Sequence, residues 1–318
     1  MRSCRSVARL LLTLLLLTPA TGRAQRCAPD AALTLAAAEL SLHGALPDAR
    51  SVLAIARAEG AEAPVLDAAV LTEARRDAFV DRAVSRFGET VICGEARRDG
   101  RVWIVAGPRE GQIALADDGR VRVSLRPGLA SPRLHVLASD GELWQREARA
   151  DEWVELPADL ARPLTVQLVA ADAEGPRPVA ERVIGERPAS TTVRSDEPVR
   201  ARVAMLREHA SVGPLRGNRL LEREAGRHAA QICRAGRARH VSEDGDPERR
   251  LERAGVRARH VGEAIARAED RDAAWAALRT SPSHRAALTD RRFTDVGVGE
   301  AEGGRCVVVL LAAWPRVF

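Results

Sequence analysis

The sequence contains no lysine and no tyrosine, and its only asparagine is Asn218. All 49 basic residues are therefore arginine, a bias that the codon usage of a GC-rich bacterial genome explains without selection for phosphate binding. The formal charge of +5 includes four arginines and no acids within residues 1–24, so the rest of the chain carries about 5 − 4 = +1. A chain so close to neutrality lacks the basic surface of a nucleic-acid-binding protein, and we expect no nucleic acid partner.

Long apolar runs are also scarce. Residues 10–17 form one, and the arginines before it and the small residues Gly22 and Ala24 after it predict a secretory signal peptide over residues 1–24. This run is too short to span a bilayer, and no other stretch approaches a transmembrane span. Cys27 lacks the small neighbours that a lipoprotein cysteine needs. The sequence therefore predicts an exported monomer, secreted or periplasmic, without a transmembrane segment.

Cysteine is infrequent, and four cysteines follow the predicted signal peptide: Cys27, Cys93, Cys233 and Cys306. An even number in an exported chain predicts two disulfides, with three possible connectivities. We expect Cys27–Cys93 and Cys233–Cys306, because each pair lies within one predicted domain and joins a helical stretch to a later strand. The alternative is that Cys233 and Cys306 are buried free thiols among apolar residues. No pair has CxxC spacing, which argues against a thiolate zinc site.

The length of the chain predicts several domains. Residues 29–82 are alanine-rich with helical spacing and residues 87–108 are typical of two strands around a polar turn, so residues 25–108 are predicted to be an α+β region. Residues 109–185 change to short alternating strands, typical of a small β-sandwich that serves as a spacer or, less often, as a binding module. Residues 186–198 are polar and proline-bearing, and we interpret them as a linker.

Residues 199–318 are predicted to form the C-terminal domain. Apolar spacing predicts helices over 199–210, 218–235, 246–254 and 270–279, and a further short helix begins after Ser281, a good N-cap, with Pro282 at its first position. Two strands, 294–301 and 305–314, close the chain, and the second is apolar enough to be buried on both faces. Helices that cover such a sheet predict an α/β/α sandwich, within a chain that is α+β and multidomain.

This domain also carries an ordered series of short motifs. In chain order they are Pro214-Leu215, His228-Ala229, His240, Asp244-Gly245, Arg250, Ala254-Gly255, Gly262-Glu263-Ala264-Ile265-Ala266, Ser281-Pro282-Ser283-His284-Arg285, Phe293-Thr294 and Gly297-Val298-Gly299. The series resembles the CAP superfamily (cysteine-rich secretory, antigen 5 and pathogenesis-related proteins, also called SCP-like), and its bacterial branch in particular, over about residues 199–313. The chain departs from the family pattern at Ala264 and Ala287, where the family has asparagine, and at Leu278, where it has tryptophan.

The resemblance implies a ligand groove in which His240, Glu263 and His284 converge. His228 falls on the buried face of its predicted helix and is expected to be a core histidine. The helix dipole favours a neutral ring at His284, whereas a nearby Glu263 would favour imidazolium and a charged, anion-binding site. His240 and His284 are therefore candidate ligands for a weakly bound zinc ion, and no other cofactor is expected.

Members of the CAP superfamily bind lipids, peptides or other surfaces more often than they catalyse reactions. The resemblance therefore implies an exported ligand-binding protein that takes a lipid, a peptide or a cell-surface component, more than it implies an enzyme, and no catalytic residue is assigned. A metal-assisted hydrolase and a structural module without a ligand are the alternatives.

The N-terminal region repeats part of the C-terminal pattern. Phe87, Gly94-Glu95-Ala96 and Gly100-Arg101 parallel Phe293, Gly299-Glu300-Ala301 and Gly304-Arg305. We interpret residues 25–108 as a degenerate CAP-like copy that lacks the histidines. The alternative is a chance likeness of two hairpins in a chain rich in alanine, arginine and glycine.

Overall fold

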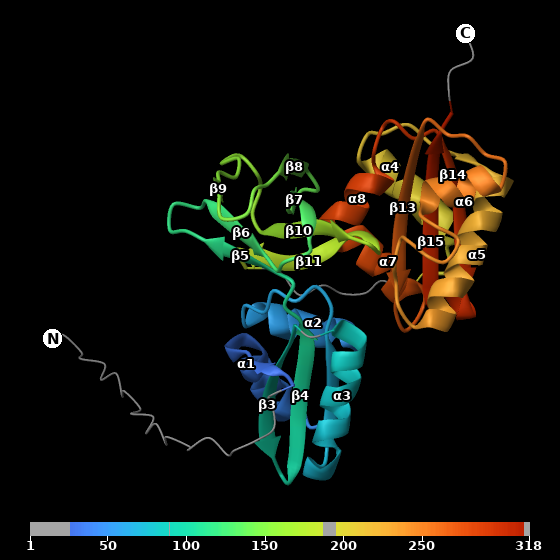
Figure 1. Cartoon of the computed structure of the whole chain (residues 1–318). Helices are drawn as coiled ribbons and strands as arrows, with labels where there is room; N and C mark the ends of the chain where they lie inside the picture. Colours follow the sequence, from blue (N-terminus) through green and yellow to red (C-terminus); the bar gives the residue numbers. More distant parts are fainter. Residues whose placement is uncertain (1–25, 89, 187–194, 315–318) are drawn as a thin grey trace.

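The computed structural model describes residues 26–88, 90–186 and 195–314. The predicted signal peptide, and most of the predicted linker, lie outside the described residues. The described part of the chain mixes helices and strands in several sheets, which form an N-terminal unit (26–108), a β-sandwich unit (110–186) and a C-terminal unit (195–314) (Figure 1). None of the helices in this part is both long enough and apolar enough to cross a membrane.

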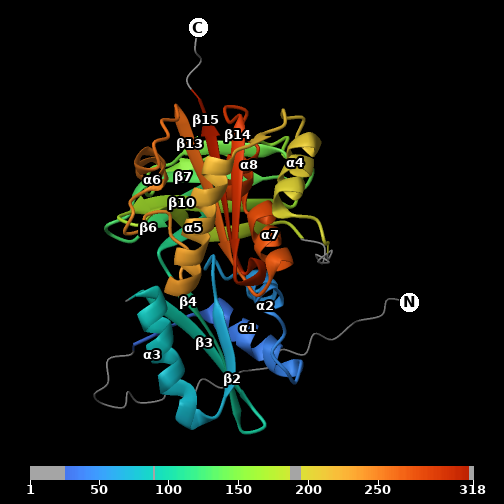
Figure 2. The ribbon, with the colours of Figure 1, turned by 90° about the vertical axis from the view of Figure 1, so that its right-hand side faces the viewer.

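The C-terminal unit is a four-stranded sheet with helices on both faces. Its elements are α4 (Val199–His209), β12 (Arg216–Gly217), α5 (Arg219–Ala235), α6 (Pro247–Arg253), β13 (His260–Arg267), α7 (Arg271–Thr280), α8 (Pro282–Leu288), β14 (Asp295–Ala301) and β15 (Cys306–Ala313). The strand order is β12-β14-β15-β13, and β12 is parallel to β14 while the other pairs are antiparallel. Along β15, Val307 and Val309 pack with α4, α7 and α8, whereas Val308 and Leu310 pack with α5 and α6. Figure 2 looks onto the α5 side of this sheet, with strands of the β-sandwich behind it.

The N-terminal unit follows the same plan. Its elements are β1 (Ala28–Pro29), α1 (Ala31–Leu42), α2 (Ala49–Ala58), β2 (Asp67–Leu71), α3 (Arg76–Phe87), β3 (Val91–Arg98) and β4 (Arg101–Pro108). The order β1-β3-β4-β2, with β1 parallel to β3, matches β12-β14-β15-β13 strand for strand. Trp103 and Val105 of β4 pack with α1 and α2, and Val102 and Ile104 pack with α3, so helices again cover both faces.

The two sheets also share their register against the adjacent helix. Asp30 caps α1 and Asn218 caps α5 through their side chains. A Cβ on Gly94 would lie 2.0 Å from the backbone of Leu33, and a Cβ on Gly297 would lie 2.1 Å from the backbone of Leu221. Leu33 and Leu221 are each the third residue after the cap. Gly94 is therefore equivalent in position to Gly297. The parallel drawn from the sequence had instead matched it with Gly299, two residues later.

The alanine-rich stretch 29–82 is not helical throughout, contrary to the prediction. β2 interrupts it and pairs antiparallel with β4. Alanine favours helix locally, but pairing with an apolar central strand overrides a weak intrinsic preference. In this register Ala68 pairs with Val105, as Glu263 of β13 pairs with Leu310. The N-terminal unit therefore carries no carboxylate at the position of Glu263.

The β-sandwich unit consists of two sheets around an apolar core. Its strands are β5 (Gly111–Leu115), β6 (Val121–Leu125), β7 (Ala130–Leu137), β8 (Leu143–Glu147), β9 (Trp153–Val154), β10 (Leu164–Asp172) and β11 (Gly175–Ile184). One sheet has the order β11-β10-β7-β8 and the other β5-β6-β9. Alternate residues such as Leu134, Val166 and Leu168 fill the core between them. Figure 1 shows α8 of the C-terminal unit against the first of these sheets.

Two disulfides hold the outer units, and they are the pairs that the sequence predicted. Cys27–Cys93 joins the start of the N-terminal unit to β3, and Cys233–Cys306 joins α5 to β15. The alternative of free thiols at Cys233 and Cys306 does not hold. Loops of 66 and 73 residues would each stabilise the fold by about 4 kcal/mol in the chain-entropy account.

The close approach of helix and strand makes a prediction for both outer units. Gly297→Ala and Gly94→Ala should each lower the free energy of unfolding by about 3 kcal/mol or more, because the added methyl group meets backbone atoms that cannot move aside. Scanning calorimetry would measure the loss. Gly226→Ala, in α5 with open space around its Cβ, should instead stabilise by up to about 1 kcal/mol. Little change in Gly94→Ala would argue against the shared register.

Candidate functional site

Glu263 on β13 is a buried carboxylate, with a side chain that is 1 % exposed. Its Oε1 accepts a hydrogen bond from Nδ1 of His240 at 2.9 Å, and its Oε2 accepts one from the Arg250 guanidinium. Burial raises the pKa of this carboxyl, but the hydrogen bond and charge of His240, together with the charge of Arg250, more than offset that effect and hold the pKa below its usual value. Glu263 is therefore ionised at neutral pH, with both oxygens engaged.

His240 lies in the loop between α5 and α6, which polar side chains hold in place. Nε2 of His228 donates to the backbone oxygen of Arg239 at 2.9 Å. Nη1 of Arg250 donates to the backbone oxygens of His240 at 2.7 Å and Gly245 at 3.0 Å. His228, which is 1 % exposed, thus supports the loop from the interior. Arg250 was not among the predicted site residues, yet it holds both the loop and the Glu263 carboxylate.

His284 lies in the first turn of α8. Ser281 stands at the N-cap position and Pro282 at the first helical position, as the sequence indicated, but the Ser281 hydroxyl makes no capping bond. It donates instead to Oε1 of Gln167 in the β-sandwich, at 3.1 Å. Nδ1 of His284 is buried and has no hydrogen-bond partner within the described part of the chain.

The ring of His284 is strongly biased toward its neutral form. Burial lowers its pKa, and the positive charges of His240 and His135 lower it further, to about 3. A neutral ring was expected from the helix dipole, but desolvation is the larger cause here. Glu263, which was expected to pull the other way, is instead bonded to His240 and Arg250.

A row of polar residues on the β-sandwich faces the same region. His135 on β7, Gln167 on β10 and Glu181 on β11 are direct cross-strand partners, so their side chains share one face of the sheet. They are only 8, 2 and 4 % exposed, although this face points away from the sandwich core. The sequence does not single out these three residues, because alternation places them on the solvent side of their strands and no local pattern shows that another unit covers them.

Gln167 joins this row to α8. Its Oε1 accepts hydrogen bonds from Oγ of Ser283 at 2.6 Å, from the backbone N–H of Ser283 at 3.1 Å and from Ser281. Its Nε2 donates to Oε2 of Glu181 at 2.8 Å, and Oε1 of Glu181 lies 2.7 Å from Nη2 of Arg57 on α2. A buried polar chain therefore runs from the N-terminal unit through the β-sandwich to the helix that carries His284.

The donor set does not make a complete metal site. Across residues 26–88, 90–186 and 195–314, no group of three or more His, Cys, Asp or Glu side chains is placed to hold a metal ion. Glu263 is committed to His240 and Arg250, which leaves the two imidazoles of His240 and His284. Two protein donors are fewer than the three that catalytic zinc sites use.

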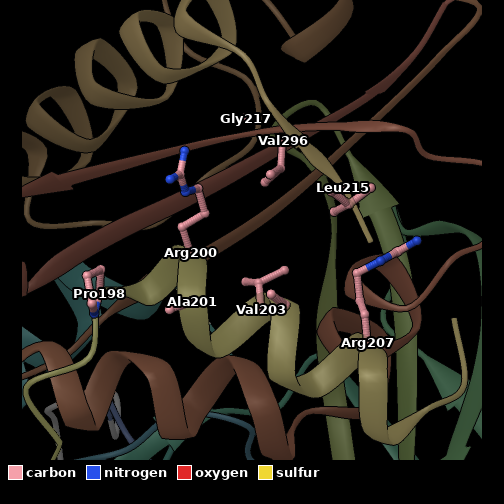
Figure 3. A pocket seen from close by; sticks show the side chains of 9 residues that line it. Pro198, Arg200, Ala201, Val203, Arg207, Leu215, Gly217 and Val296 are labelled. Carbon is pink, nitrogen blue, oxygen red and sulfur yellow. The ribbon is translucent and has the colours of Figure 1, made fainter. Parts of the chain in front are cut away.

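A separate cavity of about 400 Å³ lies between α4 and the β12–β14 edge of the C-terminal sheet. Figure 3 shows its apolar lining residues Val203, Leu215 and Val296, together with the side chains of Arg200 and Arg207. The Arg207 guanidinium donates to the backbone oxygens of Gly213, Leu288 and Asp290 and so holds loops together. None of the predicted site residues lines this cavity.

Comparisons with known proteins give only distant structural likenesses. No protein-family model matches the chain, and no curated protein matches it. An extracellular protein with an SCP domain from Bacillus anthracis is similar at 14 % identity and a TM-score of 0.35, over 64 % of this chain and 89 % of that one. A cysteine-rich secretory protein from Staphylococcus aureus is similar at 10 % identity and a TM-score of 0.31, over 73 % and 89 %. An outer surface protein from Borrelia burgdorferi is similar at 20 % identity and a TM-score of 0.35, over 37 % and 90 %.

The lowered pKa values of His284 and His135 predict a loss of stability in acid. In the unfolded chain each ring takes up its proton near pH 6.5. In the folded chain the pKa is about 3 for His284 and about 4 for His135. Burial lowers the pKa of His135, and the positive charge of Arg133 lowers it further. The unfolded state then holds more protons between these values, so stability must fall as the pH decreases from about 6.5 to about 3. Each ring can contribute up to about 1.4 kcal/mol per pH unit.

Urea unfolding between pH 4 and pH 8 would measure this dependence. The double variant His135→Gln, His284→Gln should unfold with a flatter dependence on pH than the wild type below pH 6.5. The same slope in both proteins would show that these rings do not control acid stability.

Proposed function

We propose that the chain is an exported CAP-like protein that binds a ligand at the site of His240, Glu263 and His284. The ordered motif series and the helices on both faces of the C-terminal sheet support the CAP-like assignment. The two disulfides fit an oxidising compartment, either extracellular or periplasmic. The ligand class that we propose is a lipid, a peptide or a cell-surface component, with no nucleic acid involved.

One observation favours binding over catalysis: both oxygens of Glu263 are engaged. A general base works best with a pKa near the operating pH and must reach the proton that it abstracts. Glu263 has a lowered pKa and no free oxygen, and the pKa of His284 is about 3. Neither group suits proton transfer at neutral pH, whereas the His240 ring, which Glu263 holds in place and which is 18 % exposed, can contact a ligand.

Native mass spectrometry of the purified protein, followed by extraction, tests the proposal. A molecule that co-purifies with the wild type and is lost in His240→Ala and His284→Ala would support a ligand at this site. A matched variant, His209→Ala on the exposed end of α4, should retain it. Hydrolysis of a broad ester and peptide panel that vanishes in His284→Ala would instead favour the metal-assisted hydrolase and overturn the assignment of a binding protein.

Zinc binding is the second test of the same residues. Because Nδ1 of His240 is bonded to Glu263, its Nε2 is the ring nitrogen left for a metal, and Glu263 would act by orienting the ring. We expect calorimetric titration with zinc to give weak binding, because only two imidazoles are left as ligands. His240→Ala and His284→Ala should each abolish it, and His209→Ala on the exposed end of α4 should not. Unchanged zinc affinity in the first two variants would exclude this pair as the ligands.

A further inference from the structure

The outward face of the β7–β10–β11 sheet is the surface that stands over the histidine site. His135, Thr165, Gln167 and Glu181 alternate along its strands and are all less than 9 % exposed. Polar side chains on the outer face of a sandwich are normally solvated, so their burial shows that this face is an interface within the chain. α8 packs against β7 and β10 and, on its other side, against β13 (Figure 1).

The hairpin turn between β10 and β11 reaches the loop that carries His240. The backbone N–H of Val241 donates to the backbone oxygen of Glu174 at 3.1 Å. The carboxylate of Glu174 pairs with Nη2 of Arg237 at 2.6 Å. Glu174 thus holds this loop twice. Its backbone oxygen binds the backbone of Val241, and its carboxylate binds the side chain of Arg237 at the start of the loop.

Gly175, next in the turn, lies directly against His240. Its φ is +98°, a conformation that side chains rarely adopt, and a Cβ there would lie 3.0 Å from Cβ of His240. The turn can approach the histidine this closely only because residue 175 has no side chain. The side chain of His240 is 18 % exposed.

We propose that the β-sandwich is a built-in cover of the histidine site, locked by the turn Asp172–Gly175 against the loop Arg237–Val241. The partner that the loop Arg237–Val241 binds is thus an acidic turn of the same chain. A macromolecular ligand then reaches His240 only when the sandwich moves away. The inference rests on the proposed function for the statement that the covered site binds a ligand, but the cover itself can be tested without any ligand.

Chemical modification of histidine measures the cover directly. Diethyl pyrocarbonate would be added to the full-length protein, and the rate of carbethoxylation at His240 would be followed by peptide mass spectrometry. The rate at His43, whose side chain is 51 % exposed, serves as the internal reference. In the wild type, His240 should react several-fold more slowly than His43.

Reversing the charge at the lock should open it. Glu174→Arg places two arginines opposite each other, and the relative rate at His240 should rise by about fivefold, as expected for the loss of an ion pair of this exposure. Arg237→Glu should do the same. The double variant Glu174→Arg, Arg237→Glu restores opposite charges and should return the rate toward that of the wild type. The side chains of Arg237 and Glu174 are 52 and 26 % exposed and belong to no hydrophobic core, so all three variants should fold.

A glycine pair gives a second, independent comparison. Gly175→Val should raise the rate at His240, because the valine side chain would collide with Cβ of His240 and push the turn away from it. Gly119→Val introduces the same residue at a similar φ of +83°, in a turn of the same sandwich with open space around it, and should leave the rate unchanged. Equal rates at His240 and His43 in the wild type, or no increase in Glu174→Arg and Gly175→Val, would overturn the cover. Loss of the co-purified ligand without these changes would concern the proposed function alone.

Discussion

The side-chain amide of Gln167 holds the three units of this protein in one arrangement. It is 2 % exposed, accepts three hydrogen bonds from the start of α8 and donates one to Glu181, which in turn pairs with Arg57. Each group in such a buried chain has lost its water, so breaking one link leaves its neighbours unsatisfied at a cost of about 1–3 kcal/mol each. The position of α8, and therefore of His284, depends on a residue from another unit.

The N-terminal unit contributes to this arrangement without contributing to the site. It has the strand order of the C-terminal unit, and Ala68 stands where the latter has Glu263. Common descent of the two units is our interpretation of the shared register. The N-terminal unit contacts the β-sandwich through two polar side chains. Arg57 pairs with Glu181, and Glu62 binds Arg182 and the backbone N–H of Ile113. Through these contacts the N-terminal unit holds the β-sandwich in place.

The sequence predicted features that depend on local pattern and missed those that depend on tertiary packing. Helices with caps and stop signals, such as α5 between Asn218 and Gly236, follow from short-range preferences, and the motif series singled out His240, Glu263 and His284. The strands β2 and β13 were not predicted, because alanine and glycine in them carry little strand preference and pairing with β4 and β15 decides. His135 and Gln167 could not be found either, since only docking of the β-sandwich buries the outer face of its strands.

A cover that belongs to the same chain changes how binding to this protein is measured. Because it is tethered, the acidic turn competes with outside ligands at an effective concentration that dilution does not reduce, of the order of millimolar for short connections. The apparent dissociation constant of any ligand that needs the open site equals its intrinsic value divided by the open fraction. If the lock leaves one molecule in a hundred open, a ligand of micromolar intrinsic affinity binds with an apparent constant of about 0.1 mM. Weak binding by the whole chain would thus report the closed state of the sandwich, and the intrinsic affinity of the histidine site has to be measured in a variant whose turn no longer pairs with Arg237.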